Sequence, residues 1–113
     1  MTFNTLADFY PYYLQEHRNA TCRLCHLAGS ATVIGILLFL AFTGSWSYIW
    51  VCLLAGYGPA WVGHFFFENN RPATFKHPLY SFVSDWLMVK DMLTGKIPLF
   101  EDLPLVELQM PEA

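Results

Sequence analysis

Four histidines and one glutamate are the residues whose types could do metal chemistry in this sequence. His17 and His26 lie in the first third of the chain, His64 and His77 lie beyond its middle, and Glu68 follows His64 by four residues. Imidazole nitrogen binds zinc, copper, iron and nickel. Residues four apart share a helix face, so Glu68 could be a further ligand or could hold His64 in place. Two histidines with one carboxylate approach the facial arrangement of non-haem iron oxygenases.

A second motif, C-x-x-C-H, is formed by Cys22, Cys25 and His26. This order is typical of the attachment site of a c-type haem, and a cysteine pair can also bind zinc. One pair supplies only two zinc ligands, and the third cysteine, Cys52, lies deep in a distant apolar segment. The haem interpretation depends on the side of a membrane that the motif occupies, because covalent haem attachment takes place on the outer side of the bacterial membrane.

The segment that must position these residues carries no charge. No Asp, Glu, Lys or Arg occurs in the 44 residues from Leu24 to Phe67, and the run is broken only by the turn-like Thr43-Gly44-Ser45. Residues 24–42 and 46–67 would each form a helix of roughly 30 Å, the thickness of a bilayer core. The sequence therefore predicts a helical hairpin through a membrane. The alternative, a soluble protein with two buried helices, is disfavoured because 113 residues could hardly cover so much apolar surface.

The basic residues predict the orientation of this hairpin. Arg18 and Arg23 flank its entry, Arg71 and Lys76 flank its exit, and the turn has none. The positive-inside rule therefore places both chain termini in the cytoplasm. The C-x-x-C-H motif would then lie at the cytoplasmic end, where thiols stay reduced, so we predict no covalent haem and only structural or incidental cysteines.

Helices are expected on both sides of the hairpin. The spacing of Leu6, Phe9, Tyr13 and His17 predicts an amphipathic N-terminal helix, and Pro78 can open a C-terminal helix that stops at Gly95. The predicted fold is an all-α, small integral membrane bundle with a central transmembrane hairpin. We expect residues 1–98 to form a single membrane-embedded domain and residues 99–113 to form an acidic, flexible tail.

The hairpin brings two histidines to the same depth. His26 lies 19 residues before Ser45 and His64 lies 19 residues after it, so their imidazoles should meet near the cytoplasmic end. Small residues, such as Gly29 and Gly56, would let the two helices approach closely. With His17 before the hairpin and His77 after it, all four histidines could reach one zone. We therefore predict a metal or cofactor site there.

Several alternatives remain open on these residues alone. Two histidines at equal depth would also suit a b-type haem held without a covalent bond, in an electron carrier. A non-catalytic membrane scaffold would need no metal. Glu68 could instead form a helix-end salt bridge with Arg71. Nucleic-acid binding is not expected, because the chain carries six Lys and Arg against nine Asp and Glu and has no basic run.

Three stretches of the chain carry a family resemblance: F-Y-P-Y-Y-L-Q-E-H-R-N, C-R-L-C-H-L-A-G, and G-Y-G-P-A-W-V-G-H-F-F-F-E-N-N-R-P-A-T-F. Over roughly residues 6–97 the chain resembles a short bacterial member of the yeast-type 2-hydroxy fatty acid dioxygenase family, named for phytosphingosine breakdown to odd-numbered fatty acids. Its most specific part is G-H-x-x-x-E followed by R-P-A.

The resemblance implies an iron(II)-dependent dioxygenase that shortens a 2-hydroxy fatty acid by one carbon with molecular oxygen. It implies a multi-pass protein of the bacterial inner membrane, and it carries His17, His26, His64 and Glu68 into the site. With His77 added, the four histidines are our expected metal ligands and Glu68 our expected catalytic residue. Arg18 and Arg71 lie at the same interface and are expected to hold the substrate carboxylate.

Overall fold

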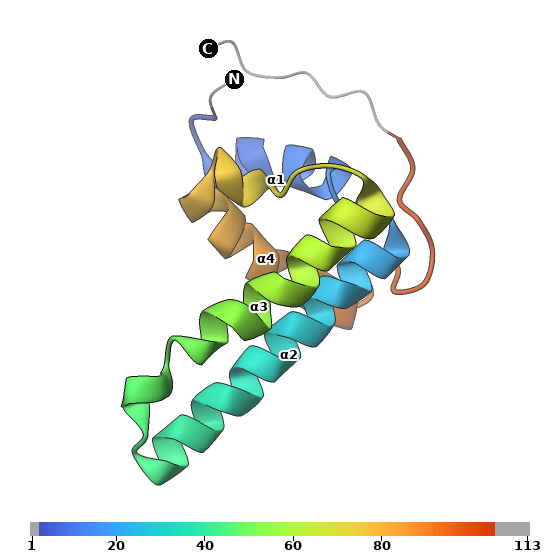
Figure 1. Cartoon of the computed structure of the whole chain (residues 1–113). Coiled ribbons are helices and arrows are strands. Elements are labelled where there is room, and N and C mark those ends of the chain that lie inside the picture. Colours follow the sequence, from blue (N-terminus) through green and yellow to red (C-terminus); the bar gives the residue numbers. More distant parts are fainter. Residues whose placement is uncertain (1–2, 106–113) are drawn as a thin grey trace.

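The chain is all-α, as the sequence predicts. The computed structural model describes residues 3–105. Its four α-helices are α1 (Leu6–Gln15), α2 (Ala20–Thr43), α3 (Val51–Val62) and α4 (Pro78–Leu93), with shorter turns η1 (Trp46–Tyr48), η2 (Gly63–Glu68) and η3 (Ala73–Phe75). Figure 1 shows α2 and α3 side by side as a long hairpin, with α1 and α4 gathered at its open end.

The predicted hairpin and its turn are confirmed. Gly44 ends α2 in the left-handed conformation, with φ 71°, and its amide donates to the carbonyl of Leu40. Glycine adopts this conformation without the clash that a Cβ would cause. After η1 the chain returns as α3, which continues directly into η2, a π-helical turn. His26 of α2 and His64 of η2 are therefore held at fixed positions relative to each other at the open end of the hairpin.

Close approach of the two helices depends on one glycine. A Cβ built on Gly29 would lie 2.9 Å from the backbone oxygen of Gly56. Backbone at this position cannot move aside as a flexible side chain could. The expected contact between small residues of the two helices is therefore present.

The Gly29→Ala variant should destabilise the protein by about 1–3 kcal/mol, because the added methyl group forces the helices apart. Gly35→Ala is the matched control, since it lies in the same helix and its Cβ would meet nothing within 4 Å. Alanine there should be neutral or stabilising by up to about 1 kcal/mol, from helix propensity alone. Thermal unfolding in detergent measures both; equal melting temperatures for the two variants would show that the close approach contributes nothing.

The outer surface of the hairpin is apolar. α2 and the segment Trp46–Glu68 are long and apolar enough to cross a bilayer, yet only 22% and 17% of their most apolar windows are buried. Phe42, for example, is 93% exposed. A core helix of a soluble protein buries most of such a window, so burial within this chain does not account for these residues.

The open end contains a compact aromatic core. Thr5 caps α1 by accepting a hydrogen bond from the Asp8 amide at 3.1 Å. Phe9 and Tyr13 of α1 pack with Met88 and Met92 of α4 in one buried cluster. The N-terminal helix therefore leans against α4, and α4 in turn packs against α2.

The residues that follow α4 run back across the start of α2. The Leu103 amide donates to the Arg18 carbonyl at 2.9 Å, and the Ala20 amide donates to the Asp102 carboxylate at 2.8 Å. Of the tail predicted over 99–113, the first seven residues are thus partly held by specific hydrogen bonds. Residues 106–113 lie outside the described part of the chain.

Candidate metal centre

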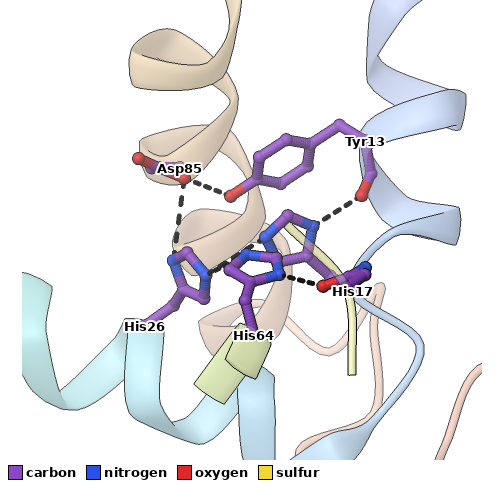
Figure 2. A network of polar contacts seen from close by, with 6 residues as sticks. Tyr13, His17, His26, His64 and Asp85 are labelled. Carbon is purple, nitrogen blue, oxygen red and sulfur yellow. Dashed lines mark hydrogen bonds and ion pairs between the residues drawn. The ribbon is translucent and has the colours of Figure 1, made fainter. Parts of the chain in front are cut away.

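Three of the four histidines meet at the open end of the hairpin. His17 lies in the turn after α1, His26 in α2 and His64 in η2. The Nε2 atoms of His17 and His26 are 3.1 Å apart, and those of His26 and His64 are 3.2 Å apart. All three residues are buried, and their ligand atoms lie within 4.8 Å of one another. Figure 2 shows the three rings converging, which confirms the predicted equal depth of His26 and His64.

The other ring nitrogen of two histidines is fixed by an acceptor. Nδ1 of His17 lies 2.6 Å from the Tyr13 carbonyl, which can only accept, so this nitrogen carries the proton. Nδ1 of His64 lies 2.7 Å from Oδ1 of Asn70, whose amide nitrogen donates to the carbonyl and carboxylate of Glu16. Both Nε2 atoms are left with a lone pair. Acceptors of this kind orient metal-binding histidines in proteins.

The Asp85 carboxylate lies beside Nδ1 of His26, whereas the other two histidines lie beside its Nε2 atom. Nδ1 of His26 lies 3.7 Å from Oδ1 of Asp85, and the Tyr13 hydroxyl donates a hydrogen bond to the same carboxylate. Burial raises the pKa of Asp85 to about 7, although the hydrogen bond from Tyr13 opposes the shift. Burial and the neighbouring Asp85 raise the pKa of Tyr13, so its hydroxyl stays protonated and keeps donating. Figure 2 shows this chain of contacts from Tyr13 through Asp85 to His26.

The three imidazoles fit a transition metal ion. Metal–nitrogen bonds of about 2.0–2.1 Å, at angles between octahedral and tetrahedral, place neighbouring nitrogens roughly 2.8–3.4 Å apart. The observed 3.1 and 3.2 Å lie in this range. Burial, with the nearby His26 and His64, holds the pKa of His17 well below 6.5, so that ring is neutral, as a ligand must be.

The space beside the histidines is small and has a free polar group. A cavity of about 10 Å³ is lined by the three histidines together with Tyr13, Ser81 and Asp85, among others. That is about the volume that a single water molecule requires. The Ser81 hydroxyl is buried and has no hydrogen-bond partner among the described residues. A buried orphan hydroxyl of this kind suits a site that takes a small polar ligand.

The local fold explains why His64 reaches the site. The π-helical turn η2 widens the end of α3, and such turns are frequent at functional sites. Asn69 then takes the left-handed conformation, with φ 60°, and the Asn70 amide donates to the His64 carbonyl at 3.0 Å. This reversal swings the Asn70 side chain back onto the His64 ring.

The remaining predicted site residues lie elsewhere. His77 precedes α4, and its ring packs against Phe3 and Phe9, so the structure does not bring it to the other three histidines. The Glu68 carboxylate accepts hydrogen bonds from the backbone amides of Arg18 at 2.9 Å and Asn19 at 2.7 Å. It thereby holds the turn that carries His17, instead of facing the Nε2 atoms.

The two predicted arginines occupy different settings. Nε of Arg18 donates to the Leu103 carbonyl at 3.0 Å. Arg71 is exposed and lines a groove of about 470 Å³ with mixed polar and apolar walls, which also include Asn70 and Lys76. Of the two guanidinium groups, only that of Arg71 borders a groove next to a residue that contacts the histidines.

The cysteines take no part in the three-histidine group. Cys22, Cys25 and Cys52 are free thiols, and Cys22 is buried where Gly63 approaches it. A Cβ on Gly63 would lie 3.0 Å from both Cα and Sγ of Cys22. This packing agrees with the structural role predicted for Cys22 and brings the two helices together beside His64.

Three contributors to the site were not predicted: Tyr13, Asn70 and Asp85. Tyr13 shares the helix face of His17, which places it nearby but does not reveal its hydroxyl partner. Asp85 is an acid in an otherwise apolar stretch of α4, and that isolation is the signal that could have identified it. Nothing in the sequence around Asn70 predicts the reversal that turns it toward His64.

The fold and the site define an all-α protein with two long apolar helices and a buried three-histidine group able to hold a metal ion. Residues 3–97 match the family described as 2-hydroxy-palmitic acid dioxygenase Mpo1-like. The match covers most of the chain, so the chain belongs to this family, as the resemblance implied. Comparison with curated proteins and with solved structures gives no match.

Removing the Asn70 side chain should weaken metal binding by roughly 10–100-fold, because His64 loses the acceptor that orients it. Asn70→Ala is the test, with affinity measured by competition against a chelator. Its neighbour gives the control: Asn69→Gly should bind metal normally, since glycine adopts the left-handed conformation without strain. Equal affinities for the two variants would mean that the contact between Asn70 and His64 does not orient the ring.

Proposed function

We propose that this protein is an iron(II)-dependent membrane dioxygenase that removes one carbon from 2-hydroxy fatty acids. The observation that carries the proposal is the convergence of the Nε2 atoms of His17, His26 and His64 in a chain of a dioxygenase family. Histidine nitrogen suits iron as well as zinc or copper, and the family's reaction with oxygen favours iron among these metals.

The proposed reaction is balanced. A 2-hydroxy acid and one O₂ give the acid shorter by one carbon, CO₂ and H₂O. The bond between C1 and C2 breaks, the two carbons together lose four electrons, and O₂ accepts them. When bound by the three histidines, iron would supply the redox and Lewis-acid chemistry that this step requires.

The chain's own residues would prepare the site. Tyr13 and Asn70 fix the ring orientation of His17 and His64, so the Nε2 lone pairs face a common point before any ion arrives. Ser81 offers an unused hydroxyl to a polar ligand in the same space. The Asp85 carboxylate, 3.7 Å from Nδ1 of His26, would help to hold that ring in place.

The arginines and Glu68 have different proposed roles. Arg71 is the better placed of the two predicted arginines to attract a carboxylate, because it borders the groove beside Asn70. Arg18 and Glu68 are proposed to position the turn that carries His17, through the contacts of the Arg18 side chain and the Glu68 carboxylate. The fatty acid would approach from the apolar side of the protein.

The membrane is part of the proposal. α2 and the segment Trp46–Glu68 are proposed to cross a bacterial inner membrane, which would cover their exposed apolar side chains. We further propose that the open end and both termini lie in the cytoplasm, which the positive-inside rule supports through Arg18, Arg23, Arg71 and Lys76. The three-histidine group would then lie near the inner interface, within reach of both lipid and water.

A b-type haem fits this site poorly. Two histidines on opposite faces of a haem need their nitrogens about 4 Å apart, with a macrocycle between them. The Nε2 pairs at 3.1 and 3.2 Å are too close together for that arrangement. The geometry therefore favours a single ion over the electron-carrier alternative.

Turnover of a defined substrate tests the proposed function. Detergent-purified protein supplied with iron(II) and oxygen should convert 2-hydroxypalmitic acid to the acid that is one carbon shorter, consuming about one O₂ per product by the balance above. Products are identified by mass spectrometry and oxygen uptake is measured with an electrode. Iron-loaded protein that leaves the 2-hydroxy acid unchanged would contradict the proposal.

A further inference from the structure

A second, larger cavity adjoins the metal centre. It has a volume of about 140 Å³ and lies between α2, α3 and α4. Three residues, His26, Tyr57 and Asp85, line both this cavity and the small one beside the histidines. The two cavities are therefore neighbours with a common wall, and this wall includes His26, one of the expected metal ligands.

The rest of this cavity is mostly apolar and reaches the surface. Its walls include Val33 of α2, Leu53 of α3, and Phe82 and Trp86 of α4. Leu53 is 62% exposed and Phe82 is 52% exposed, so these two residues form its rim. The rim lies on the apolar flank of the hairpin. A ligand that enters there would come from an apolar phase and would end against His26 and Asp85.

We propose that this cavity, named here the acyl cavity, binds the first carbons of the substrate's hydrocarbon chain; this inference rests on the proposed function. An apolar cavity of about 150 Å³ holds a benzene-sized molecule, which implies about six carbons here. With C1 and C2 at the histidines, carbons 3 to about 8 would fill the acyl cavity. Longer chains would pass between Leu53 and Phe82 and lie along the hairpin.

The other large groove does not suit a hydrocarbon chain. The groove of about 470 Å³ is lined by Glu16, Asn70, Arg71 and Lys76 among others, and burying a chain against their charged groups would strip those groups of water. It also shares none of the histidines with the small cavity. The acyl cavity combines an apolar wall with direct contact to His26.

The size of the acyl cavity predicts how turnover depends on the length of the fatty acid. The turnover efficiency kcat/KM should rise as the substrate lengthens to about eight carbons, because each added methylene buries more apolar surface. Beyond that length it should change little when substrates are compared at equal mole fraction in detergent micelles. The protein would thus recognise the substrate carbons nearest the carboxyl group and accept fatty acids that differ in the length of the rest of their hydrocarbon chain.

Photocrosslinking tests the location without requiring turnover. The probe is a 2-hydroxy fatty acid that carries a diazirine at its sixth carbon, added to metal-free protein in detergent micelles. Labelled residues are mapped by mass spectrometry. We expect labels on Cys52, Phe82 or Trp86, which line the acyl cavity. Labels concentrated around Phe75 and Lys76, or spread evenly over the hairpin, would overturn the inference.

A filled cavity gives the matching functional test. Ser30→Phe places a large side chain in the acyl cavity, whereas Ala31→Phe adds the same ring at the next, exposed position of α2. Ser30→Phe should keep its metal, because it is not one of the histidines, and should lose at least about tenfold in kcat/KM for 2-hydroxypalmitic acid. Ala31→Phe should match the parent protein.

The two tests separate the inference from the proposed function. If the parent protein did not turn over 2-hydroxypalmitic acid but the probe still labelled the acyl cavity, the proposed chemistry would fail while the binding site stood. If Ser30→Phe used 2-hydroxypalmitic acid as well as Ala31→Phe does, the acyl cavity would be the wrong site, whatever the chemistry.

Discussion

Replacing either His26 or His64 by alanine should reduce metal content from about one ion per chain to near zero and abolish turnover. Each ring supplies one of the three ligand nitrogens that lie within 4.8 Å of one another. Loss of a residue that merely orients a ligand costs about 10–100-fold in metal affinity, so loss of the ligand itself should cost more than 100-fold. Elemental analysis and product formation measure the two effects.

The matched control is the fourth histidine. His77 packs against Phe3 and Phe9, away from the other three rings, so His77→Ala should keep its metal. Circular dichroism of all three variants should show the helical content of the parent. A His77→Ala protein without metal beside a His64→Ala protein with normal metal would reverse the assignment.

Arg23→Met should destabilise the protein by about 3 kcal/mol or more, which lowers its melting temperature by at least about 10 °C. Arg23 is 0% exposed, and its guanidinium donates to four backbone carbonyls. Those of His17 and Arg18 belong to the turn before α2, and those of Pro98 and Glu101 to the segment after α4. Methionine has a similar length but no donor, so these carbonyls would lose the guanidinium, and that of Arg18 would keep only the Leu103 amide as a donor among the described residues.

Two further variants show what Arg23 does. Arg23→Lys keeps the positive charge but loses the planar fork of donors, so it should be intermediate in melting temperature. Lys96→Met removes a cation at an exposed position and should change stability by no more than about 0.5 kcal/mol. An Arg23→Met protein as stable as Lys96→Met would mean that the carbonyls find other donors.

The hairpin and the meeting of two histidines could be predicted because both follow from periodicity. A 44-residue run without charge predicts two long helices, and Thr43-Gly44-Ser45 predicts the turn between them. Because His26 and His64 lie equally far from that turn, they are predicted to lie at the same depth. Gly29 supplied the last part of the prediction, because small residues at a helix contact mark where backbones approach. These inferences use only distances along regular helices.

The rest of the site depends on irregular backbone, which spacing does not determine. His17 reaches the centre through a turn after α1, whereas His77, in the loop before α4, is held by aromatic packing instead. Glu68 shares a helical spacing with His64, but the π-helical turn and the start of α2 draw its carboxylate to backbone amides. Asn70 joins the site through a left-handed residue that the sequence pattern does not reveal.

Hydrogen bonds between residues far apart in the sequence could not be predicted from it either. Asp85 meets Tyr13 and His26 only because α1 and α4 pack over the open end of the hairpin. The segment after α4 carries acids and prolines, a composition typical of flexible tails, yet its backbone carbonyls satisfy the buried guanidinium of Arg23. The buried guanidinium of Arg23 needs hydrogen-bond acceptors, and the segment after α4 supplies two of them.

The metal content of the purified chain tests the central claim most directly. The protein would be purified in detergent without added metal or oxygen, then measured by elemental analysis and absorption spectroscopy on the same sample. We expect about one iron per chain and no haem Soret band, with the iron lost in His26→Ala and His64→Ala. A chain that holds no metal even after iron(II) is supplied, or a strong Soret band, would contradict it.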